Sequence, residues 1–339
     1  MAQYPTKYLT VSKVLAGIPN LDVMLAADIQ FRPHWFALKC FVNASAVLAW
    51  GQKPSALLAE KVAQRLQLPL VRIEDGFLRS KLLGFQSPPL SISIDDVGCY
   101  YDARYPSRLE QLIKLPASIE QLSEAKDIIT RWQQFEVSKY NVSKRVEVVS
   151  EKPFVLVIDQ TYGDASITCG LASEHSFEQM LSDAISRFPD HLIVVKTHPD
   201  VEVGHKKGHF DKHSNYTANI CWLTSDIHVS SLLKHADVVY TVTSQVGFEA
   251  LIWGKPVYCF GMPFYAGWGL TTDILKPVTS RERVTLQQLV YATLVRYCNY
   301  IDPGTGDIGN VFSLIAYCGL NPVGNCKKEL LFLSASSKL

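Results

Sequence analysis

Between Tyr240 and Gly261 the sequence places a serine and a glutamate at a spacing suited to binding a nucleotide. The order is an apolar strand, a Thr/Ser turn, a helix, a stop at Gly254 and a second apolar strand. Ser244 stands where a helix N-cap would stand, and the free N–H groups behind it, with the helix dipole, would form an anion site. Glu249, about one and a half turns further on, would accept hydrogen bonds from a ribose diol. The same residues also fit an ordinary crossover with a serine cap and a solvated glutamate.

A second polar cluster, Asp159 to Ser166, directly follows an apolar run at 154–158. Gly163 permits a tight turn that would present Asp164 to a cleft, where a carboxylate can act as a nucleophile or a base. The alternative is a turn in which Asp159 or Asp164 only caps the next helix. For Asp159 we favour this alternative.

A histidine follows the apolar run at 192–195, in the segment Lys196-Thr-His198-Pro199. The proline keeps His198 out of a helix, and an imidazole at the end of a strand can donate to a phosphate or a carboxylate. A hydrogen bond from His198 to loop backbone is the alternative interpretation.

Two further segments carry polar or aromatic groups beyond an expected strand. Glu74 and Arg79 follow the run at 70–73 and would face across a cleft toward a second domain; a turn with a surface arginine is the alternative. The glycine-rich loop after Gly261 carries Tyr265 and Trp268, which would stack on a ring or line a sugar pocket.

The elements that must hold these residues alternate along the chain. We expect a helix over 55–67 in the first block, a largely helical stretch over 109–134, and a polar linker over 135–152. Alternating strands and helices indicate parallel sheets flanked by helices, and in such sheets ligands bind beyond the carboxyl ends of the strands. Apolar runs typical of buried strands occur at 46–50, 70–73, 154–158, 192–195, 238–242 and 257–260.

The bulk composition bounds the class of protein. A chain of 339 residues is long for one core, so we expect two domains. The formal net charge of +1 argues against nucleic acid as a partner, and no apolar run of about 18 residues predicts a membrane span. The eight cysteines include no Cys-x-x-Cys pair, which favours buried thiols in a reducing cytoplasm over disulfides or zinc. His205, His209 and His213 recur at steps of four, but intervening glycines weaken the helix that a metal site would need.

Together these segments resemble the capsule polysaccharide transferases of the KpsC/LipB type, bacterial enzymes that add β-linked Kdo (3-deoxy-D-manno-oct-2-ulosonic acid) from CMP-Kdo. The family's capsule enzymes usually carry two such modules in one longer chain, and this chain has room for one. The matching segments, in family order, are 50–55, 74–80, 100–110, 159–166, 195–201, 241–250 and 264–270.

The resemblance implies an α/β fold of the GT-B type, in which two Rossmann-like domains face each other across a cleft. We expect an acceptor-side domain over 1–150, a CMP-sugar-binding domain over 151–290, and C-terminal helices and a tail over 291–339. It also implies a retaining transfer that needs an enzyme nucleophile, without a metal or other cofactor. The partners implied are CMP-Kdo and a saccharide or glycolipid acceptor, with cytoplasmic location and room for peripheral attachment to the inner membrane.

The resemblance assigns roles residue by residue. Asp164 is expected to be the nucleophile, His198 to hold the Kdo carboxylate or the leaving phosphate, and Glu74 to be the base for the acceptor hydroxyl. Ser244 and Gln245 would bind the phosphate and Glu249 the ribose. The remaining expected binding residues are Arg79, Gln160, Thr161, Lys196, Tyr265 and Trp268.

Three other functions fit parts of the pattern. A sialyl- or polysialyl-type CMP-sugar transferase would share a His-Pro segment and a serine-rich nucleotide site, but it would not explain the resemblance over 50–110. A nucleotide-sugar epimerase of the same architecture would need no acceptor. A non-catalytic component of polysaccharide export would tolerate the loss of Asp164 and His198, yet this chain has both.

Overall fold

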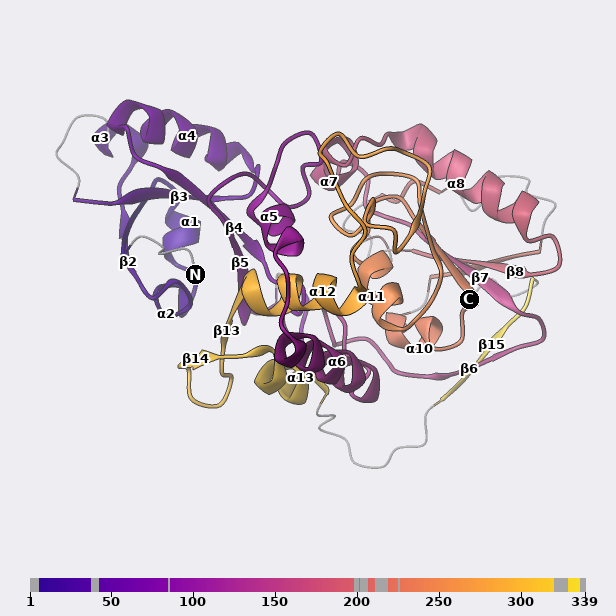
Figure 1. The fold of residues 1–339 in the computed structure, drawn as a ribbon. Coiled ribbons are helices and arrows are strands. Elements are labelled where there is room, and N and C mark those ends of the chain that lie inside the picture. Colours follow the sequence, from indigo (N-terminus) through magenta and orange to yellow (C-terminus); the bar gives the residue numbers. More distant parts are fainter. Residues whose placement is uncertain are drawn as a thin grey trace.

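Two β-sheets, each at the centre of one α/β unit, form the framework of this computed structural model (Figure 1). The structure describes residues 6–37, 43–84, 86–197, 201, 207–210, 219–224, 226–319 and 329–335. The two α/β units face each other across a cleft, which confirms the predicted fold class. No helix within these ranges is long and apolar enough to span a bilayer.

Within the described residues the N-terminal sheet has seven strands, in the order β14-β13-β5-β4-β3-β1-β2. Its centre is parallel, whereas β5 runs antiparallel to β4 and β13 antiparallel to β5. The strands are β1 (Lys7–Thr10), β2 (Asp28–Phe31), β3 (Ala46–Trp50), β4 (Leu70–Asp75), β5 (Ser91–Asp95), β13 (Cys298–Ile301) and β14 (Ile308–Gly309). The strands predicted at 46–50 and 70–73 are confirmed.

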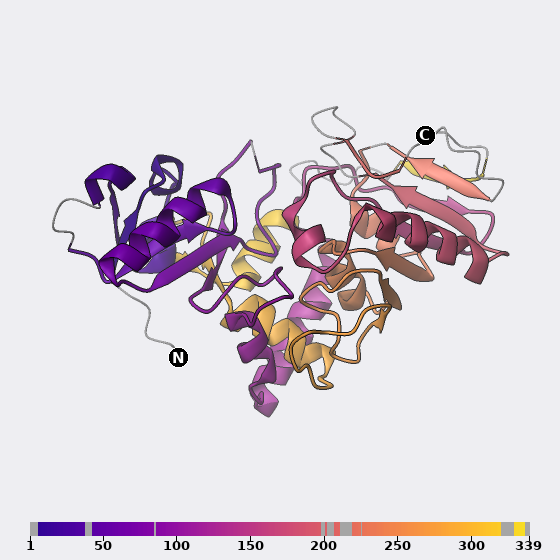
Figure 2. The same cartoon turned by 90° about the horizontal axis from the view of Figure 1, so that it is seen from above.

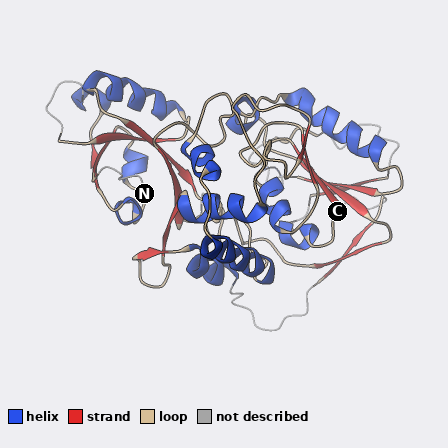
Figure 3. Ribbon diagram, viewed as in Figure 1, coloured by secondary structure: helices blue, strands red, loops and turns tan. Residues whose placement is uncertain are grey.

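Helices cover both faces of this sheet (Figure 3). The helix α4 (Pro54–Leu66) packs its alanines and Val62 on one face, close to the predicted range of 55–67. The short helices α1 (Lys13–Ala16) and α2 (Leu21–Leu25) bury leucines on the other face. A further short helix, α3 (His34–Ala37), contacts α4.

The C-terminal sheet is parallel throughout, in the order β12-β11-β10-β7-β8-β9. Its strands are β7 (Phe154–Ile158), β8 (Leu192–Lys196), β9 (Ile220–Leu223), β10 (Val238–Thr241), β11 (Val257–Cys259) and β12 (Thr272–Asp273). Its helices are α7 (Ala165–Cys169), α8 (Glu174–Arg187), α10 (Val229–Leu233) and α11 (Val246–Ile252). All four strands predicted for this block are found, and β9 is an addition.

A layer of helices joins the two units beneath the cleft (Figures 1 and 2). The predicted helical stretch over 109–134 is two helices, because Pro116 lies between them and Ser118 starts the second with a capping box. The second of them packs against α12 and α13. The joining elements are α5 (Arg108–Lys114), α6 (Ile119–Gln134), α12 (Leu286–Tyr291), the π-helical turn η1 (Ala292–Arg296) and α13 (Val311–Gly319).

Two segments differ from the domain division expected from sequence. Residues 291–339 are not only helices and a tail, because β13 and β14 cross back and extend the N-terminal sheet. Residues 135–152 are not a free linker: β6 (Glu147–Ser150) pairs with β15 (Leu330–Leu333), and Val137 is fully buried. In both places a short strand buries apolar side chains. The pattern of such a short strand does not indicate which sheet it will join.

Candidate functional site

The two units enclose a cleft of about 750 Å³. One wall follows β3 and β4, and the other follows β7, β8 and β10, so it lies at the carboxyl ends of parallel strands. Most of the residues predicted from sequence line it: Glu74, Gln160, Thr161, Asp164, Lys196, Ser244, Gln245 and Glu249.

Asp164 lines the cleft and also caps a helix, while its role as a nucleophile stays a prediction. Gly163 adopts a φ of 78°, the left-handed turn that only glycine enters readily, and Asp164 follows as the N-cap of α7. Its Oδ1 accepts a hydrogen bond from the Ser166 N–H at 2.9 Å. Its Oδ2 has no hydrogen-bond partner among the described residues. One oxygen therefore orients the carboxylate, which lines the cleft.

The neighbouring Asp159 and Gln160 hold the loops of this wall together. Asp159 Oδ1 accepts hydrogen bonds from the backbone N–H groups of Gln160 at 2.8 Å and His209 at 3.0 Å. Burial raises the pKa of Asp159 to about 6. Gln160 Oε1 accepts from the Thr243 N–H at 2.8 Å and so ties the end of β7 to the end of β10. Asp159 thus bonds the loop backbone.

In the segment Ser244–Glu249 the structure corrects the expected helix N-cap and rules out the solvated glutamate of the alternative interpretation. The N-cap of α11 is Gln245, and Ser244, one residue earlier, accepts a hydrogen bond from the Val246 N–H at 3.2 Å. Glu249 is not solvated: it is 1% exposed, and its Oε1 accepts from the backbone N–H of Lys139 at 3.2 Å. Burial raises the pKa of Glu249 to about 7, and its Oε2 is buried without a partner.

Glu74 enters the cleft from the end of β4, on the wall opposite Asp164. The Tyr101 hydroxyl donates to its Oε1 at 3.2 Å. Burial, and next the charge of Asp75, raise the pKa of Glu74 to about 7. Gly51 makes room for this carboxylate, because a Cβ there would lie 1.7 Å from Glu74 Oε1. A carboxyl group with a pKa near 7 is suited to accept a proton at neutral pH.

Three residues expected to bind substrate lie behind the cleft wall instead. Arg79 is 5% exposed and bonds Asp75 at 2.7 Å as well as the carbonyls of Ser87 and Gly84. The Tyr265 hydroxyl donates to the Ser244 carbonyl, and Trp268 Nε1 donates to the Phe264 carbonyl at 2.8 Å. Both rings are fully buried. Their polar groups are satisfied by the protein, so they support the wall and do not line it.

His198 lies outside the described residues, as do His205 and His213. Lys196 is 6% exposed and donates to the Thr197 carbonyl at 3.3 Å. Within the described ranges no group of three His, Cys, Asp or Glu side chains could hold a metal ion.

Several polar residues of the cleft were not predicted from the sequence. Tyr101 bonds both Glu74 and the backbone N–H of Gln52, although it stands in a segment that resembles the family. Lys139 lies in the stretch interpreted as a linker, and His228 is the N-cap of α10. A single lysine in a polar stretch has no periodic signal, so only the fold brings Lys139 into the site.

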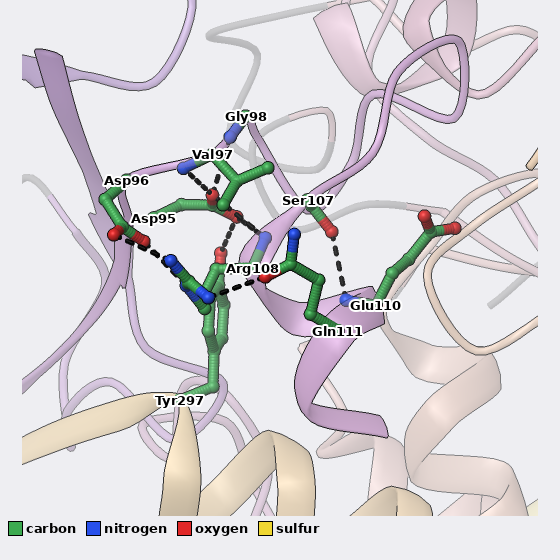
Figure 4. A network of polar contacts seen from close by, with 9 residues as sticks. All are labelled: Asp95, Asp96, Val97, Gly98, Ser107, Arg108, Glu110, Gln111 and Tyr297. Carbon is green, nitrogen blue, oxygen red and sulfur yellow. Dashed lines mark hydrogen bonds and ion pairs between the residues drawn. The ribbon is translucent and has the colours of Figure 1, made fainter. Parts of the chain in front are cut away.

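A polar network behind the site fixes the turn between β5 and α5 (Figure 4). Asp95 is 2% exposed and accepts hydrogen bonds from the N–H groups of Val97, Gly98 and Arg108 and from the Tyr297 hydroxyl. Asp96 pairs with the Arg108 guanidinium through two hydrogen bonds of 2.7 and 2.8 Å. The network joins the N-terminal sheet to the residue that follows η1.

A buried ion pair ties the loop of Tyr265 and Trp268 to α5. Arg281 Nε lies 2.7 Å from Glu110 Oε1, and the side chains are 2% and 7% exposed. Arg281→Met would leave the Glu110 charge buried and unpaired, so we expect unfolding free energy to fall by about 3–5 kcal/mol in urea titrations. The exposed Arg283→Met serves as the control. A loss below 1 kcal/mol in Arg281→Met would show that the pair does not hold the loop.

Comparison with known proteins places these features in a family. A family model described as capsule polysaccharide biosynthesis protein matches residues 45–126 and 117–300. Over 321 residues, 90% of this chain, the sequence is 40% identical to the capsule polysaccharide modification protein LipA of Neisseria meningitidis serogroup B. It is 35% identical over 294 residues to the lipopolysaccharide-processing protein LpsZ of Rhizobium meliloti. The chain spans 44% of the length of LipA and 66% of the length of LpsZ.

Two solved structures from Thermosulfurimonas dismutans match nearly the whole chain. The KpsC β-Kdo 2,4 transferase is 39% identical with a TM-score of 0.87, covering 94% of this chain and 99% of that one. The KpsC β-Kdo 2,7 transferase is 28% identical with a TM-score of 0.67, covering 92% of this chain and 99% of that one.

Proposed function

Since the chain belongs to the capsule polysaccharide biosynthesis protein family, we propose that it is a glycosyltransferase that transfers Kdo from CMP-β-Kdo with retention of configuration. The observation that carries this proposal is the TM-score of 0.87 to a β-Kdo 2,4 transferase of which this chain covers 99%. The lower TM-score of 0.67 to the 2,7 transferase favours a 4-hydroxyl as the acceptor group.

In the first step of the proposed reaction, an Asp164 oxygen attacks C2 of Kdo. The bond from C2 to the phosphate oxygen breaks, and CMP leaves with the electron pair. The product is a Kdo ester of Asp164 with inverted configuration. The hydrogen bond from the Ser166 N–H supports this role, since it orients the carboxylate while Oδ2 has no described partner.

In the second step an acceptor hydroxyl attacks the same carbon, and Asp164 leaves as a carboxylate. Glu74 takes the hydroxyl proton, so the two inversions give net retention. The support for Glu74 is its position on the wall opposite Asp164 and its pKa of about 7.

The proposed nucleotide site is the C-terminal wall around residues 243–249. The buried Glu249 Oε2, which lacks a hydrogen-bond partner, is suited to accept a ribose hydroxyl. The roles expected for Ser244, Gln245, Gln160, Thr161 and Lys196 in binding CMP-Kdo stay proposals, as does the role of His198. The residues needed for the proposed steps are charged and hydrogen-bonding side chains, and no cofactor enters either step.

The acceptor is proposed to be a saccharide or a glycolipid, with a Kdo-terminated glycolipid as the first candidate. Such an acceptor would be presented at the cytoplasmic face of the inner membrane, so a cytoplasmic protein with peripheral attachment there is part of the proposal.

A product assay tests this function. The protein is incubated with CMP-Kdo and a Kdo-terminated glycolipid, and CMP release and the acceptor mass are followed. We expect release of CMP together with an acceptor mass increase of one Kdo residue, and nuclear magnetic resonance of the product should show a β-2,4 linkage. If the protein neither binds nor turns over CMP-Kdo, the transferase proposal fails and a binding role in polysaccharide export takes its place. CMP release without acceptor gain would point to hydrolysis or epimerase-like chemistry.

A further inference from the structure

Lys139 stands at the junction of the two units. Its carbonyl accepts a hydrogen bond from the Arg79 N–H of the N-terminal unit at 3.0 Å. Its own N–H donates to Glu249 Oε1 of the C-terminal unit at 3.2 Å. The backbone of Lys139 is therefore held from both sides, and its side chain lines the cleft.

The ammonium group of Lys139 makes few contacts with the part of the chain that the structure describes. It forms no hydrogen bond or ion pair with any described residue, and its one described contact is with the Tyr140 ring, 5.8 Å from the ring centre. Of the other two lysines lining the cleft, Lys196 donates to a backbone carbonyl. Lys53 also has only a ring contact among the described residues, 4.7 Å from the centre of Trp50, but it follows β3 on the N-terminal wall, whereas Lys139 stands at the junction of the two units. A cation without a partner in a cleft is suited to bind an anionic group of a ligand.

Lys139 remains charged despite its surroundings. Burial acts to lower its pKa, but Tyr140, Asp75, Glu74 and Asp164 together raise the pKa of Lys139 above its ordinary value. Two of these groups, Glu74 and Asp164, are the proposed reacting carboxyls. Lys139 lines the same cleft as both of these carboxyl groups, so its side chain borders the space in which the reacting carbon would lie.

Resting on the proposed function, we propose that Lys139 binds the carboxylate of the donor sugar beside Asp164. Kdo carries its carboxylate on C2, the carbon that Asp164 attacks, so the attack brings two negative charges together. A cation between the Asp164 carboxylate and the Kdo carboxylate offsets this repulsion. Its attraction to both carboxylates grows as the reacting atoms approach each other.

The phosphate of the donor is the other anion that could be bound. In a displacement at C2 the leaving phosphate lies on the side opposite the attacking oxygen, whereas the carboxylate lies to the side of that line. Lys139 stands at the junction of the two units, beside the cleft walls that carry Asp164 and Glu74, so we assign it to the carboxylate.

The experiment compares Lys139→Met, which keeps the length of the side chain, with Lys139→Arg, which keeps its charge. Calorimetry measures binding of CMP alone, and steady-state kinetics measure transfer from CMP-Kdo. For Lys139→Met we expect kcat/KM for CMP-Kdo to fall by about 10- to 150-fold, the range for a lost bond to a charged group. CMP affinity should change less than threefold, and Lys139→Arg should recover part of the transfer.

A second readout isolates the carboxylate. Inhibition of the wild type by free Kdo should be at least about tenfold stronger than inhibition by its methyl ester, and in Lys139→Met this preference should disappear. The exposed Lys126→Met on α6 should leave all of these values unchanged. Equal loss of CMP and CMP-Kdo binding in Lys139→Met would assign the lysine to the phosphate and overturn the inference. So would an unchanged preference for Kdo over its ester. If the wild type does not use CMP-Kdo, the proposed function itself fails.

Discussion

Asp164→Asn is expected to abolish Kdo transfer, with a loss of about 10⁴-fold or more in kcat. Asparagine keeps the shape of the side chain and caps a helix as well as aspartate does, so the hydrogen bond from the Ser166 N–H survives. The amide, however, lacks the negative oxygen that must attack C2. The measurement is CMP release and product formation under saturating CMP-Kdo, compared with the wild type.

Intact-protein mass spectrometry gives this prediction a direct signature. Wild type mixed with CMP-Kdo in the absence of acceptor should gain the mass of one Kdo residue, and Asp164→Asn should not. The exposed Asp190→Asn, in the turn after α8, is the matched control and should retain both activity and adduct. Equal activity in Asp164→Asn and the wild type would keep the reaction but remove Asp164 from its proposed role.

Glu74→Gln is expected to lower transfer to the acceptor by about 10²- to 10⁴-fold, because the amide cannot take the acceptor proton. In the wild type, burial places the pKa of Glu74 at about 7. Activity should therefore rise as pH increases through 7 and then level off. The residual activity of Glu74→Gln should not show this rise with pH. Formation of the Kdo adduct on Asp164 should continue in the variant, since the proposed first step does not use Glu74.

Stability provides an independent check on Glu74. The pKa of this carboxyl is raised in the folded state, so its favourable contribution is complete below about pH 4.5 and is lost as pH rises through 7. Glu74→Gln carries no such charge. Its melting temperature should exceed that of the wild type at pH 8, and the difference should shrink toward pH 5. A variant that is both inactive and less stable at pH 8 would indicate a structural role for Glu74 instead.

The regular parts of the fold could be predicted because their signals are local. The apolar runs that form β3, β4, β7, β8 and β10 are buried strands in the structure, and each is followed by a polar loop. At Gly163 the chain takes a φ of 78°, which favours glycine, so the residue type alone indicates a turn at this position. The cleft at the carboxyl ends of the strands then follows from the parallel order of the sheets.

The errors came where long-range packing decides the role of a side chain. Tyr265 and Trp268 look like exposed ligands in a glycine-rich loop, but Arg281 and Glu110, distant in sequence, cover that loop and bury them. Arg79 was expected in the cleft, yet Asp75 and two carbonyls satisfy its guanidinium behind the wall. The sequence patterns that predict helices and strands do not indicate which polar side chain will find a hydrogen-bond partner in the folded protein.

By itself the sequence determined the central buried strands of both sheets, the polar loops that follow them and the family resemblance, because each depends on residue types at short spacing. Only the tertiary structure decided that β13 returns to the N-terminal sheet and that Glu249 is buried against the backbone of Lys139. It also decided that Glu74 and Glu249 have pKa values near 7. Desolvation depends on atoms brought together from distant parts of the chain, and no local pattern encodes it.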